Sequence, residues 1–320
     1  MSVMSRKDLV RDIERFLVFK RALGHSYRRG ALTLRSFERY VREHAGAPRT
    51  VEFECMLRGW LARTEGRKPV TVTLELGVIR QFCLFRRRSD DRAFVPGRDW
   101  APQPAVSEFL PYIFSAEQVR LLLRRAAGIS RHPFRSTTLR ALLLVLYCTG
   151  LRLGEAVRLQ VSDVDFGQRC FFIRESKGKT RLVPFRDDLA PVLRDYLRER
   201  DRVVSSSDAG PFLVRPNGRA WPVKVASHAI RRLLRRCTLK PPCGRTGPRP
   251  YDLRHTFAVH RLTQWYRAGV DIHARLPWLS AYMGHDNILG TEVYLNATPE
   301  LIAIAAERFE RRFRGSGGPG

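Results

Sequence analysis

The sequence has few lysines, no paired cysteines and no long apolar run. Only 7 of its 58 basic residues are lysine, so arginine carries nearly all of the positive charge. Its six cysteines form no Cys-x-x-Cys pair and have no histidines at ligand spacing, so no metal or other cofactor is expected. It also lacks an apolar run of about 18 residues and a signal-peptide pattern. We therefore expect a soluble, cytoplasmic protein with reduced thiols and no membrane association.

Acidic residues are scarce beside basic ones, 31 against 58, which gives a formal charge of +27. Such a charge favours a polyanionic partner, and nucleic acid fits better than a membrane because no basic amphipathic segment adjoins an apolar anchor. The alternative is a basic surface that binds nothing. With 320 residues, the chain is long enough for two domains.

Residues 1–94 predict a domain of four helices without strands. Ser5 followed by Asp8 has the form of a capping box, and helical spacing of apolar residues follows it. Further helices are predicted over 30–44, after Thr50 as N-cap, and over 71–87. Clustered arginines suit phosphate contacts with DNA, although they could also form a solvated face. The clusters contain Arg28, Arg29, Arg35, Arg39, Arg86, Arg87 and Arg88.

The proline-rich segment 95–111 predicts a linker, and residues 112–313 predict a second domain that combines helices with a small sheet. Ser115 and Gln118 match a capping box, and Gly150 ends an apolar helix. Three β-prone runs predict an antiparallel sheet whose last hairpin tip carries Lys177 and Lys179. These runs are 157–161, 170–174 and 181–185. Helices are predicted over 137–149, 187–200, 224–237 and 253–268, the last with Asp252 as N-cap, and 314–320 reads as a disordered tail.

Four elements far apart in the second domain could form one site. Arg152 follows a glycine turn, Lys177 lies on the hairpin, Arg254 lies in the first turn of a helix, and His285 precedes Tyr294. Taken singly, each has an ordinary explanation, such as a surface charge, a satisfied histidine or a packed tyrosine. Their order and spacing carry the information.

In that order and spacing the chain resembles the tyrosine recombinase, or phage integrase, family. The matching segments are Thr149-Gly150-Leu151-Arg152 with Glu155, Lys177-Gly178-Lys179, Leu253-Arg254-His255-Thr256, Gly284-His285 and Tyr294. The resemblance covers nearly all of the second domain. It implies a mainly α fold with a small antiparallel β-sheet: a four-helix, SAM-like core-binding domain followed by an α+β catalytic domain, which together clamp double-stranded DNA.

The resemblance also implies the chemistry. Members of the family cut DNA without metal or high-energy cofactor, and a tyrosine forms a 3′-phosphotyrosyl link that a 5′-hydroxyl can reverse. Tyr294 is then the nucleophile, while Arg152 and Arg254 hold the phosphate and His285 donates a hydrogen bond to it. Lys177 protonates the departing oxygen, with Lys179 as its rival. Glu155 and His255 support the site.

Two tyrosines remain open questions. The family usually has histidine where this chain has Tyr251, and a phenol can donate to phosphate but is a poor base near neutral pH. We therefore expect Tyr251 to support phosphate binding, while general-base work is weak or falls elsewhere. Tyr282 is a second candidate nucleophile, but its apolar surroundings favour core packing.

The last helix, which begins near Thr298 and Pro299, has an apolar stripe that could pack within its own domain or dock onto a neighbouring subunit. The resemblance implies a homotetramer on two synapsed DNA sites and a role in integration, transposition or excision of a mobile element, acting on the bacterial nucleoid. Two alternatives remain: a type IB topoisomerase-like relaxing enzyme, and a catalytically silent DNA-binding relative, which Tyr251 favours.

Overall fold

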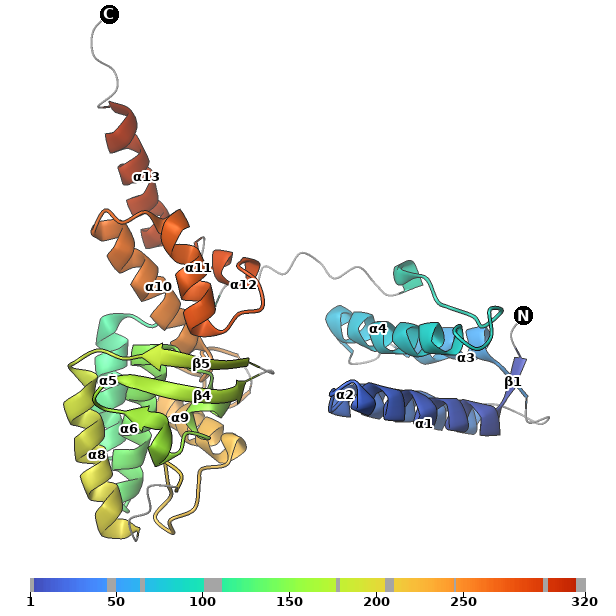
Figure 1. The fold of residues 1–320 in the computed structure, drawn as a ribbon, viewed down its shortest axis with the longest axis horizontal. Helices are drawn as coiled ribbons and strands as arrows, with labels where there is room; N and C mark the ends of the chain where they lie inside the picture. Colours follow the sequence, from blue (N-terminus) through green and yellow to red (C-terminus); the bar gives the residue numbers. More distant parts are fainter. Residues whose placement is uncertain are drawn as a thin grey trace, which may run out of the picture. The chain divides into compact units, whose positions relative to one another are not determined.

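The computed structural model describes residues 3–44, 50–63, 67–100, 111–176, 179–204, 210–244, 246–295 and 299–314. The polypeptide divides into two compact units, Met1–Phe109 and Leu110–Gly320. Both are mainly helical, and the second contains a small antiparallel sheet (Figure 1), which confirms the predicted fold class. Within the described residues, no helix is long and apolar enough to span a membrane.

The first unit is a bundle of four helices: α1 (Arg6–Ala22), α2 (Arg28–His44), α3 (Phe53–Ala62) and α4 (Pro69–Arg86). Aromatic side chains fill its core because the apolar positions recur with helical spacing. Phe16, Phe37, Phe82 and Trp60 are fully buried there. The Ser5 hydroxyl accepts a hydrogen bond from the backbone N–H of Asp8 at 3.1 Å, which confirms the N-cap half of the predicted capping box, while the Asp8 carboxylate accepts from the Ser5 hydroxyl at 2.7 Å.

A short two-stranded sheet departs from the prediction of a first unit without strands. β1 (Val3–Ser5) pairs antiparallel with β2 (Thr50–Glu52), and Thr50 lies opposite Ser5. The prediction that Thr50 caps a helix is therefore wrong, since α3 begins after Glu52. Two strands of three residues each show too little alternation to be recognised in a sequence.

Residues 95–100, the first part of the predicted linker, pack against the first unit. The 3-10 helix η1 (Arg98–Trp100) places the Trp100 ring 5.2 Å from that of Phe94 and 3.8 Å from the Arg58 guanidinium carbon. Residues 101–110 lie outside the described part of the chain, so the linker over 95–111 stays a prediction.

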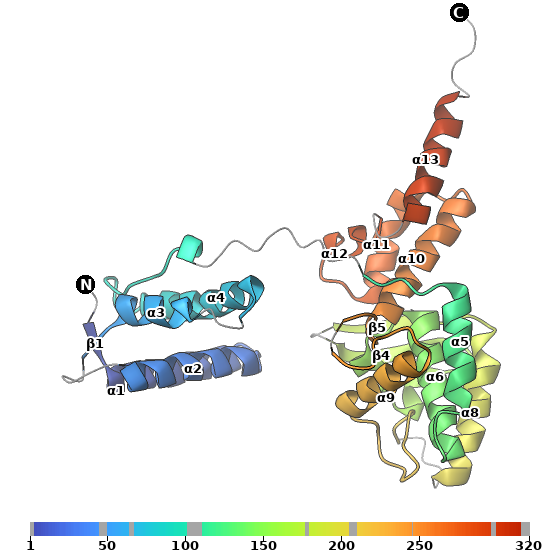
Figure 2. The same cartoon turned by 180° about the vertical axis from the view of Figure 1, so that it is seen from behind.

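In the second unit, a sheet packs on a layer of helices. The helices are α5 (Ala116–Ala127), α6 (Pro133–Thr149), α8 (Leu189–Val203) and α9 (Val223–Arg236). Strands β3 (Val164–Asp165), β4 (Cys170–Ser176) and β5 (Lys179–Pro184) form an antiparallel sheet in that order. The sheet lies across one side of α5 and α6, as Figures 1 and 2 show from opposite directions. The capping box of Ser115 and Gln118 is confirmed in both directions.

The prediction of a first strand over 157–161 is wrong. Val157 ends the short helix α7 (Leu153–Ala156), and η2 (Val161–Asp163) follows before β3 begins. Both segments turn because buried carboxylates, Glu155 and Asp163, accept hydrogen bonds from the backbone N–H three residues before them. Alternating apolar residues suit such a buried turn as well as a strand. Lys177 and Gly178, between β4 and β5, lie outside the described residues.

The remaining helices stand together at one end of the second unit (Figure 1). They are α10 (Asp252–Arg267), α11 (Ile272–Met283), α12 (Leu289–Glu292) and α13 (Pro299–Arg314). Tyr251, not Asp252, occupies the N-cap of α10, which corrects the prediction by one residue. The Asp252 carboxylate instead accepts from the backbone N–H of Arg249 at 2.7 Å. The predicted cap at Thr298 lies outside the described residues.

Candidate active site

Two left-handed glycine turns anchor the two central arginines. Gly150 ends α6 with φ 62°, and Gly284 ends α11 with φ 66°. A Cβ at Gly150 would lie 2.4 Å from the Phe257 ring, so only glycine fits there. The carbonyl of Gly150 accepts from Arg254 Nη1 at 2.7 Å, and that of Gly284 accepts from Arg152 Nη2 at 2.8 Å. Each turn therefore fixes an arginine that belongs to a distant segment.

Arg254 is almost completely buried, with 1% of its surface exposed. Its Nη2 donates to the carbonyl of Met283 at 2.5 Å, while Nε is buried without a hydrogen-bond partner among the described residues. Burial, with a contribution from Arg152, lowers the pKa of Arg254 from its ordinary value. A buried guanidinium with an unsatisfied donor has a strong preference for an anion beside it.

Arg152 belongs to a network centred on Glu155, whose side chain is 1% exposed. The Glu155 carboxylate accepts from the backbone N–H and Nη1 of Arg152 at 2.9 and 2.8 Å. It also accepts from both terminal nitrogens of Arg181, at 3.2 and 3.0 Å. Arg181 in turn donates through Nε to the carbonyl of Tyr282. One carboxylate therefore holds two guanidiniums and connects α7, β5 and α11.

We expect the substitution Glu155→Gln to lower the free energy of unfolding by about 3 kcal/mol. Glutamine keeps the shape but leaves two guanidiniums beside a neutral side chain in a buried site, which is costly. Urea denaturation followed by circular dichroism measures the change. Glu117→Gln is the matched control, because that carboxylate also pairs with an arginine but is 77% exposed. Equal losses for the two variants would contradict a structural role for Glu155.

The hydroxyl of Tyr294 lies inside this assembly. Tyr294 is 2% exposed, and its hydroxyl lies 3.0 Å from Nδ1 of His255. Burial raises the pKa of Tyr294 to about 12, and the Arg254 guanidinium opposes part of that rise. The His285 ring stacks on that of Tyr294 with centroids 6.3 Å apart, and its Nδ1 lies 2.7 Å from the Thr291 hydroxyl. The tyrosine is therefore packed, neutral and surrounded by cationic and imidazole groups.

His255 lies between two tyrosines. Its ring meets that of Tyr251 edge-on at 4.9 Å and that of Tyr294 at 5.4 Å. Burial lowers the pKa of His255 to about 4, with Asp252 opposing the change, so the ring is neutral at physiological pH. Tyr251 is 42% exposed, at the outer side of the group.

The structure thus gathers seven of the predicted site residues in one place: Arg152, Glu155, Tyr251, Arg254, His255, His285 and Tyr294. Lys177 lies outside the described residues. Lys179 begins β5, but its side chain is not among those described. The roles of both lysines stay predictions.

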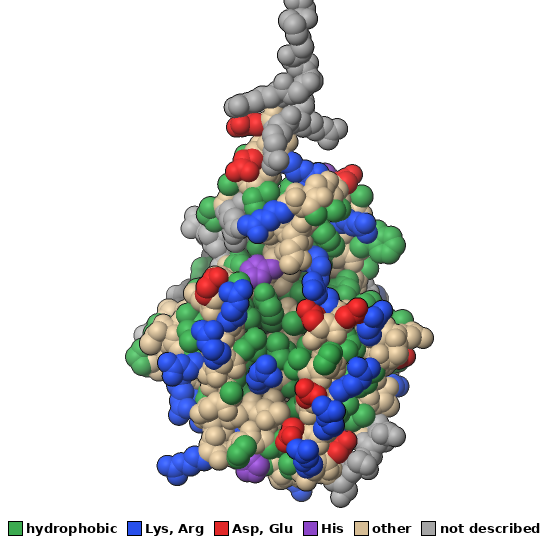
Figure 3. Space-filling model, turned by 90° about the vertical axis from the view of Figure 1, so that its left-hand side faces the viewer, with side chains coloured by type: hydrophobic (Ala, Val, Ile, Leu, Met, Phe, Trp, Pro, Cys, Tyr) green, Lys and Arg blue, Asp and Glu red, His purple; other side chains and the backbone are tan. Residues whose placement is uncertain are grey.

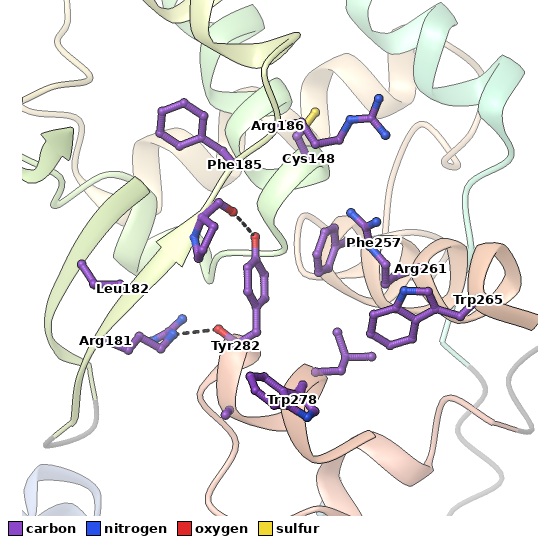
Figure 4. Close-up of a pocket in the computed structure, with 13 residues that line it drawn as sticks. Cys148, Arg181, Leu182, Phe185, Arg186, Phe257, Arg261, Trp265, Trp278 and Tyr282 are labelled. Carbon is purple, nitrogen blue, oxygen red and sulfur yellow. Dashed lines mark hydrogen bonds between the residues drawn. The ribbon is translucent and has the colours of Figure 1, made fainter. Parts of the chain in front are cut away.

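Tyr282, the alternative nucleophile, is engaged elsewhere. Its hydroxyl donates to the carbonyl of Pro184 at 2.9 Å, as Figure 4 shows. It lines a pocket of about 600 Å³ between β5, α10 and α11, where Leu182, Phe257 and Trp278 are its neighbours. Burial raises the pKa of Tyr282. These contacts agree with the prediction that Tyr282 packs.

Most of the predicted DNA-contacting arginines of the first unit are exposed. Arg28, Arg35 and Arg39 share one face of α2 by their spacing, and Arg29, Arg87 and Arg88 are exposed as well. Arg86 differs, because its Nε pairs with the Asp12 carboxylate at 3.1 Å and its side chain is 9% exposed. Arg86 therefore stabilises the bundle. On the face of the second unit seen in Figure 3, basic side chains lie on both sides of a central hydrophobic area, with acidic side chains among them.

Sequence reasoning missed Arg181 and Arg249. Arg181 occupies the same face of β5 as the buried Val183, so its inward position could have been read from the two-residue period of the strand. Arg249 fixes Asp252 through Nη2 at 2.9 Å, but it lies in a proline- and glycine-rich loop where no period applies.

The chain is similar to known recombinases over most of its length. Residues 113–300 match the phage integrase family. The chain is 32% identical to the integrase/recombinase y4rB of Sinorhizobium fredii over 94% of its own length and 96% of that protein. It is 29% identical to tyrosine recombinase XerA of Thermococcus onnurineus, covering 86% of this chain and 88% of that one.

Two solved structures share the fold. One is XerH recombinase bound to a palindromic difH substrate after cleavage, with a TM-score of 0.67, 18% identity, and coverage of 88% of this chain and 78% of that chain. The other is the Tn1549 transposon integrase in complex with transposon right end DNA, with a TM-score of 0.67, 16% identity, and coverage of 96% and 100%. The chain belongs to the phage integrase family and is therefore a tyrosine-type recombinase, a DNA strand transferase.

Proposed function

We propose that this chain cleaves and rejoins DNA at specific sites through a covalent 3′-phosphotyrosyl intermediate on Tyr294. The observation that carries the proposal is the position of the Tyr294 hydroxyl, which lies beside the buried Arg254 and 3.0 Å from His255. The family's chemistry needs a tyrosine next to a group that binds phosphate.

The two arginines fit the demands of the reaction. In-line displacement at a phosphodiester develops negative charge on the non-bridging oxygens, and fixed guanidinium donors stabilise that charge. The carbonyls of Gly150 and Met283 hold Arg254 before any DNA arrives, while its Nε keeps a donor for phosphate. Arg152 is held by Glu155 and Gly284. His285 adds a further donor.

The proposed step conserves bond energy. The Tyr294 oxygen forms a bond to phosphorus, and the bond from phosphorus to the 5′-oxygen breaks. The leaving oxygen takes a proton, which we assign to Lys177, with Lys179 as the second candidate. A 5′-hydroxyl from another strand can then attack the phosphotyrosine and release the enzyme, so neither metal nor nucleotide hydrolysis is required.

Trapping the covalent adduct tests this function. The full chain is incubated with a pool of random-sequence duplexes that carry a nick, so that the short cleaved fragment diffuses away and the adduct accumulates. We expect a protein–DNA adduct that survives denaturing electrophoresis and contains a reproducible sequence. Absence of any adduct would contradict the proposal and would favour the catalytically silent relative.

Double-stranded DNA is the proposed partner. The XerH and Tn1549 integrase structures are complexes with DNA. This chain adds a formal charge of +27 and exposed arginines on α2 and at the end of α4. Such arginines position a protein on the phosphate backbone and leave base recognition to other contacts.

The substitution Tyr251→His is expected to speed adduct formation by about tenfold. Histidine has an ordinary pKa near neutral, which makes it a better proton acceptor than the phenol it replaces and than the buried His255, whose pKa is lowered to about 4. Quench-flow or manual sampling of adduct against time measures the rate. Tyr251→Phe is the matched variant, since it removes only the hydroxyl and should not accelerate cleavage. A Tyr251→His rate equal to or below that of the natural chain would sink this interpretation.

We also propose that the chain assembles with further copies of itself on synapsed DNA, in a tetramer joined through α13. The inner face of α13 packs in its own unit, where Leu301 is fully buried and Arg308 donates to the carbonyl of Val270 at 2.8 Å. The outer face leaves Ile302 50% and Phe309 64% exposed. The pocket beside Tyr282, where Trp278 is 71% exposed, offers apolar surface for a second copy.

Phe309→Asp is expected to shift the protein on DNA to smaller assemblies, because a carboxylate cannot enter an apolar contact without a large desolvation cost. Sedimentation velocity measures the shift, with the protein bound to a duplex whose sequence is the one recovered from the trapped adduct. Val203→Asp is the control, since Val203 is 40% exposed at the end of α8. An unchanged assembly in Phe309→Asp would show that α13 packs only in its own unit.

The biological setting we propose is integration, transposition or excision of a mobile element. Its support is the similarity to proteins named as integrases, y4rB in sequence and the Tn1549 transposon integrase in fold. Recovery of the duplex sequence from the adduct would identify the element's ends.

A further inference from the structure

The groups around His255 indicate which partner donates the hydrogen bond between Tyr294 and His255. Nδ1 of His255 lies 3.0 Å from the Tyr294 hydroxyl, while Nε2 on the other side of the ring lies 4.0 Å from Oδ1 of Asp252. In a neutral imidazole one nitrogen carries the proton and the other carries a lone pair. A carboxylate near Nε2 favours the tautomer with the proton on Nε2. Nδ1 is then the acceptor, and the tyrosine hydroxyl donates to it.

Asp252, the carboxylate near Nε2 of His255, is held in place by Arg249. It is 1% exposed, and its carboxylate accepts from the backbone N–H of Arg249 at 2.7 Å and from Arg249 Nη2 at 2.9 Å. Asp252 and His255 are three residues apart on the first turn of α10, so the helix itself sets their separation. Asp252, His255 and Tyr294 thus form a row of carboxylate, imidazole and hydroxyl, the order that activates hydroxyl nucleophiles in other enzymes.

We propose that His255 is the general base of the cleavage step and that Asp252 positions it. The inference rests on the proposed function. As the Tyr294 oxygen bonds to phosphorus, its proton moves to Nδ1 of His255, and the resulting imidazolium is stabilised by the Asp252 carboxylate. On rejoining, as the 5′-hydroxyl displaces the tyrosine, His255 returns that proton to the departing phenolic oxygen.

The neighbouring groups are less suited to this role. Tyr251 offers a phenol, which can donate a hydrogen bond to a phosphate oxygen but has no basic ring nitrogen to take up a proton. The Nδ1 of His285 lies 2.7 Å from the Thr291 hydroxyl, and its ring is nearly parallel to that of Tyr294 with centroids 6.3 Å apart. The Nδ1 of His255, in contrast, lies 3.0 Å from the Tyr294 hydroxyl.

The environment of His255 determines how readily its ring accepts a proton. Burial is the main cause of the lowered pKa of His255, Asp252 opposes it, and Arg249 and Arg254 add to the lowering. A bound phosphate adds negative charge next to Arg254 and so offsets part of the cationic effect. Proton transfer is therefore coupled to substrate binding, and the free enzyme keeps Tyr294 protonated.

His255→Asn tests the proposal, because the asparagine side chain can keep a hydrogen-bonding atom near Nδ1 but cannot accept a proton. General-base catalysis contributes about 10²–10⁴-fold, so we expect adduct formation on the recovered nicked duplex to slow by about 10²-fold. His260→Asn is a closely matched control. His260 lies on the same helix and also contacts a tyrosine through Nδ1, at 3.1 Å from the Tyr147 hydroxyl. A His255→Asn rate within about twofold of the control would overturn the proposal.

A second readout separates proton transfer from positioning. Incorporation of 3,5-difluorotyrosine at position 294 lowers the pKa of the phenol, so cleavage then depends less on a base. We expect the fluorinated nucleophile to restore a large part of the rate lost in His255→Asn and to change the unsubstituted chain little. A deficit that fluorination leaves untouched would mean that His255 only packs against Tyr294.

The tautomer can be measured without DNA. In protein labelled with ¹⁵N-histidine, we expect the His255 spectrum to show an unprotonated Nδ1 and a protonated Nε2. A proton on Nδ1 would overturn the proposal even if His255→Asn failed to fold. An adduct that persists in Tyr294→Phe would instead refute the proposed function, and this inference with it.

Discussion

Arg254→Lys is expected to slow adduct formation by about 10²–10³-fold, the usual cost of removing one preorganised donor at a developing oxyanion. Lysine keeps the charge but loses the planar fork. The fork of Arg254 bonds the carbonyls of Gly150 and Met283 with its two terminal nitrogens, and its Nε has no hydrogen-bond partner among the described residues. A single ammonium group cannot hold both carbonyls and a phosphate oxygen in the same geometry. Single-turnover cleavage of the recovered duplex measures the rate.

Arg200→Lys is the control for the loss of a buried guanidinium. Arg200 is 2% exposed and bonds the carbonyl of Pro211 and the carboxylate of Asp201, far along the chain from the site. We expect both variants to lose thermal stability, while only Arg254→Lys loses cleavage. Equal cleavage rates in the two would mean that Arg254 is structural.

Tyr294→Phe is expected to abolish the adduct, a loss of at least about 10⁴-fold, because it removes the atom that bonds to phosphorus. The change deletes one oxygen from a buried side chain. Its cost to stability should stay near about 1 kcal/mol, the ordinary value for one hydrogen bond. Binding to duplex should persist, since the guanidiniums remain. Gel shift and denaturing electrophoresis on the same samples separate binding from cleavage.

Tyr282→Phe is the control for this substitution. It also removes a tyrosine hydroxyl from a packed site, where the bond to Pro184 is lost. We expect normal adduct formation in this variant. Loss of the adduct in Tyr282→Phe, with Tyr294→Phe still active, would reverse the assignment of the nucleophile.

Much of the site was predictable because Arg152 and His285 each come shortly after a glycine and Arg254 lies in the first turn of a helix. Gly150 was recognisable as a helix end, which the structure confirms, whereas Gly284 was recognised only as part of the Gly-His motif and the structure shows that it ends α11. The order of these segments, rather than any one of them, predicted the chemistry. The comparison with relatives confirms the family.

The errors share a physical cause. The pairing of β1 with β2 joins distant segments of three residues each, and the turn at 157–161 depends on two buried carboxylates. Aspartate is a favoured N-cap residue, yet the Asp252 carboxylate accepts a hydrogen bond from Arg249, which precedes the helix. In each case a hydrogen bond that the spacing of apolar residues does not specify decided the outcome.

The role proposed for His255 could not be predicted from the sequence. His255 and Tyr294 are 39 residues apart, and their contact depends on how α11 and α12 return the chain to the first turn of α10. The sequence showed only that a base was missing at Tyr251. Three-dimensional placement identified a candidate to replace it.

The most direct test of the account is the identity of the residue that carries the DNA. The trapped adduct is digested with nuclease and trypsin, and tandem mass spectrometry locates the remaining nucleotide. The expected tryptic peptide, 276–308, contains both Tyr282 and Tyr294, so fragmentation must distinguish them. We predict a 3′-phosphonucleotide on Tyr294. A nucleotide on Tyr282, on Tyr251 or on a serine would contradict the account.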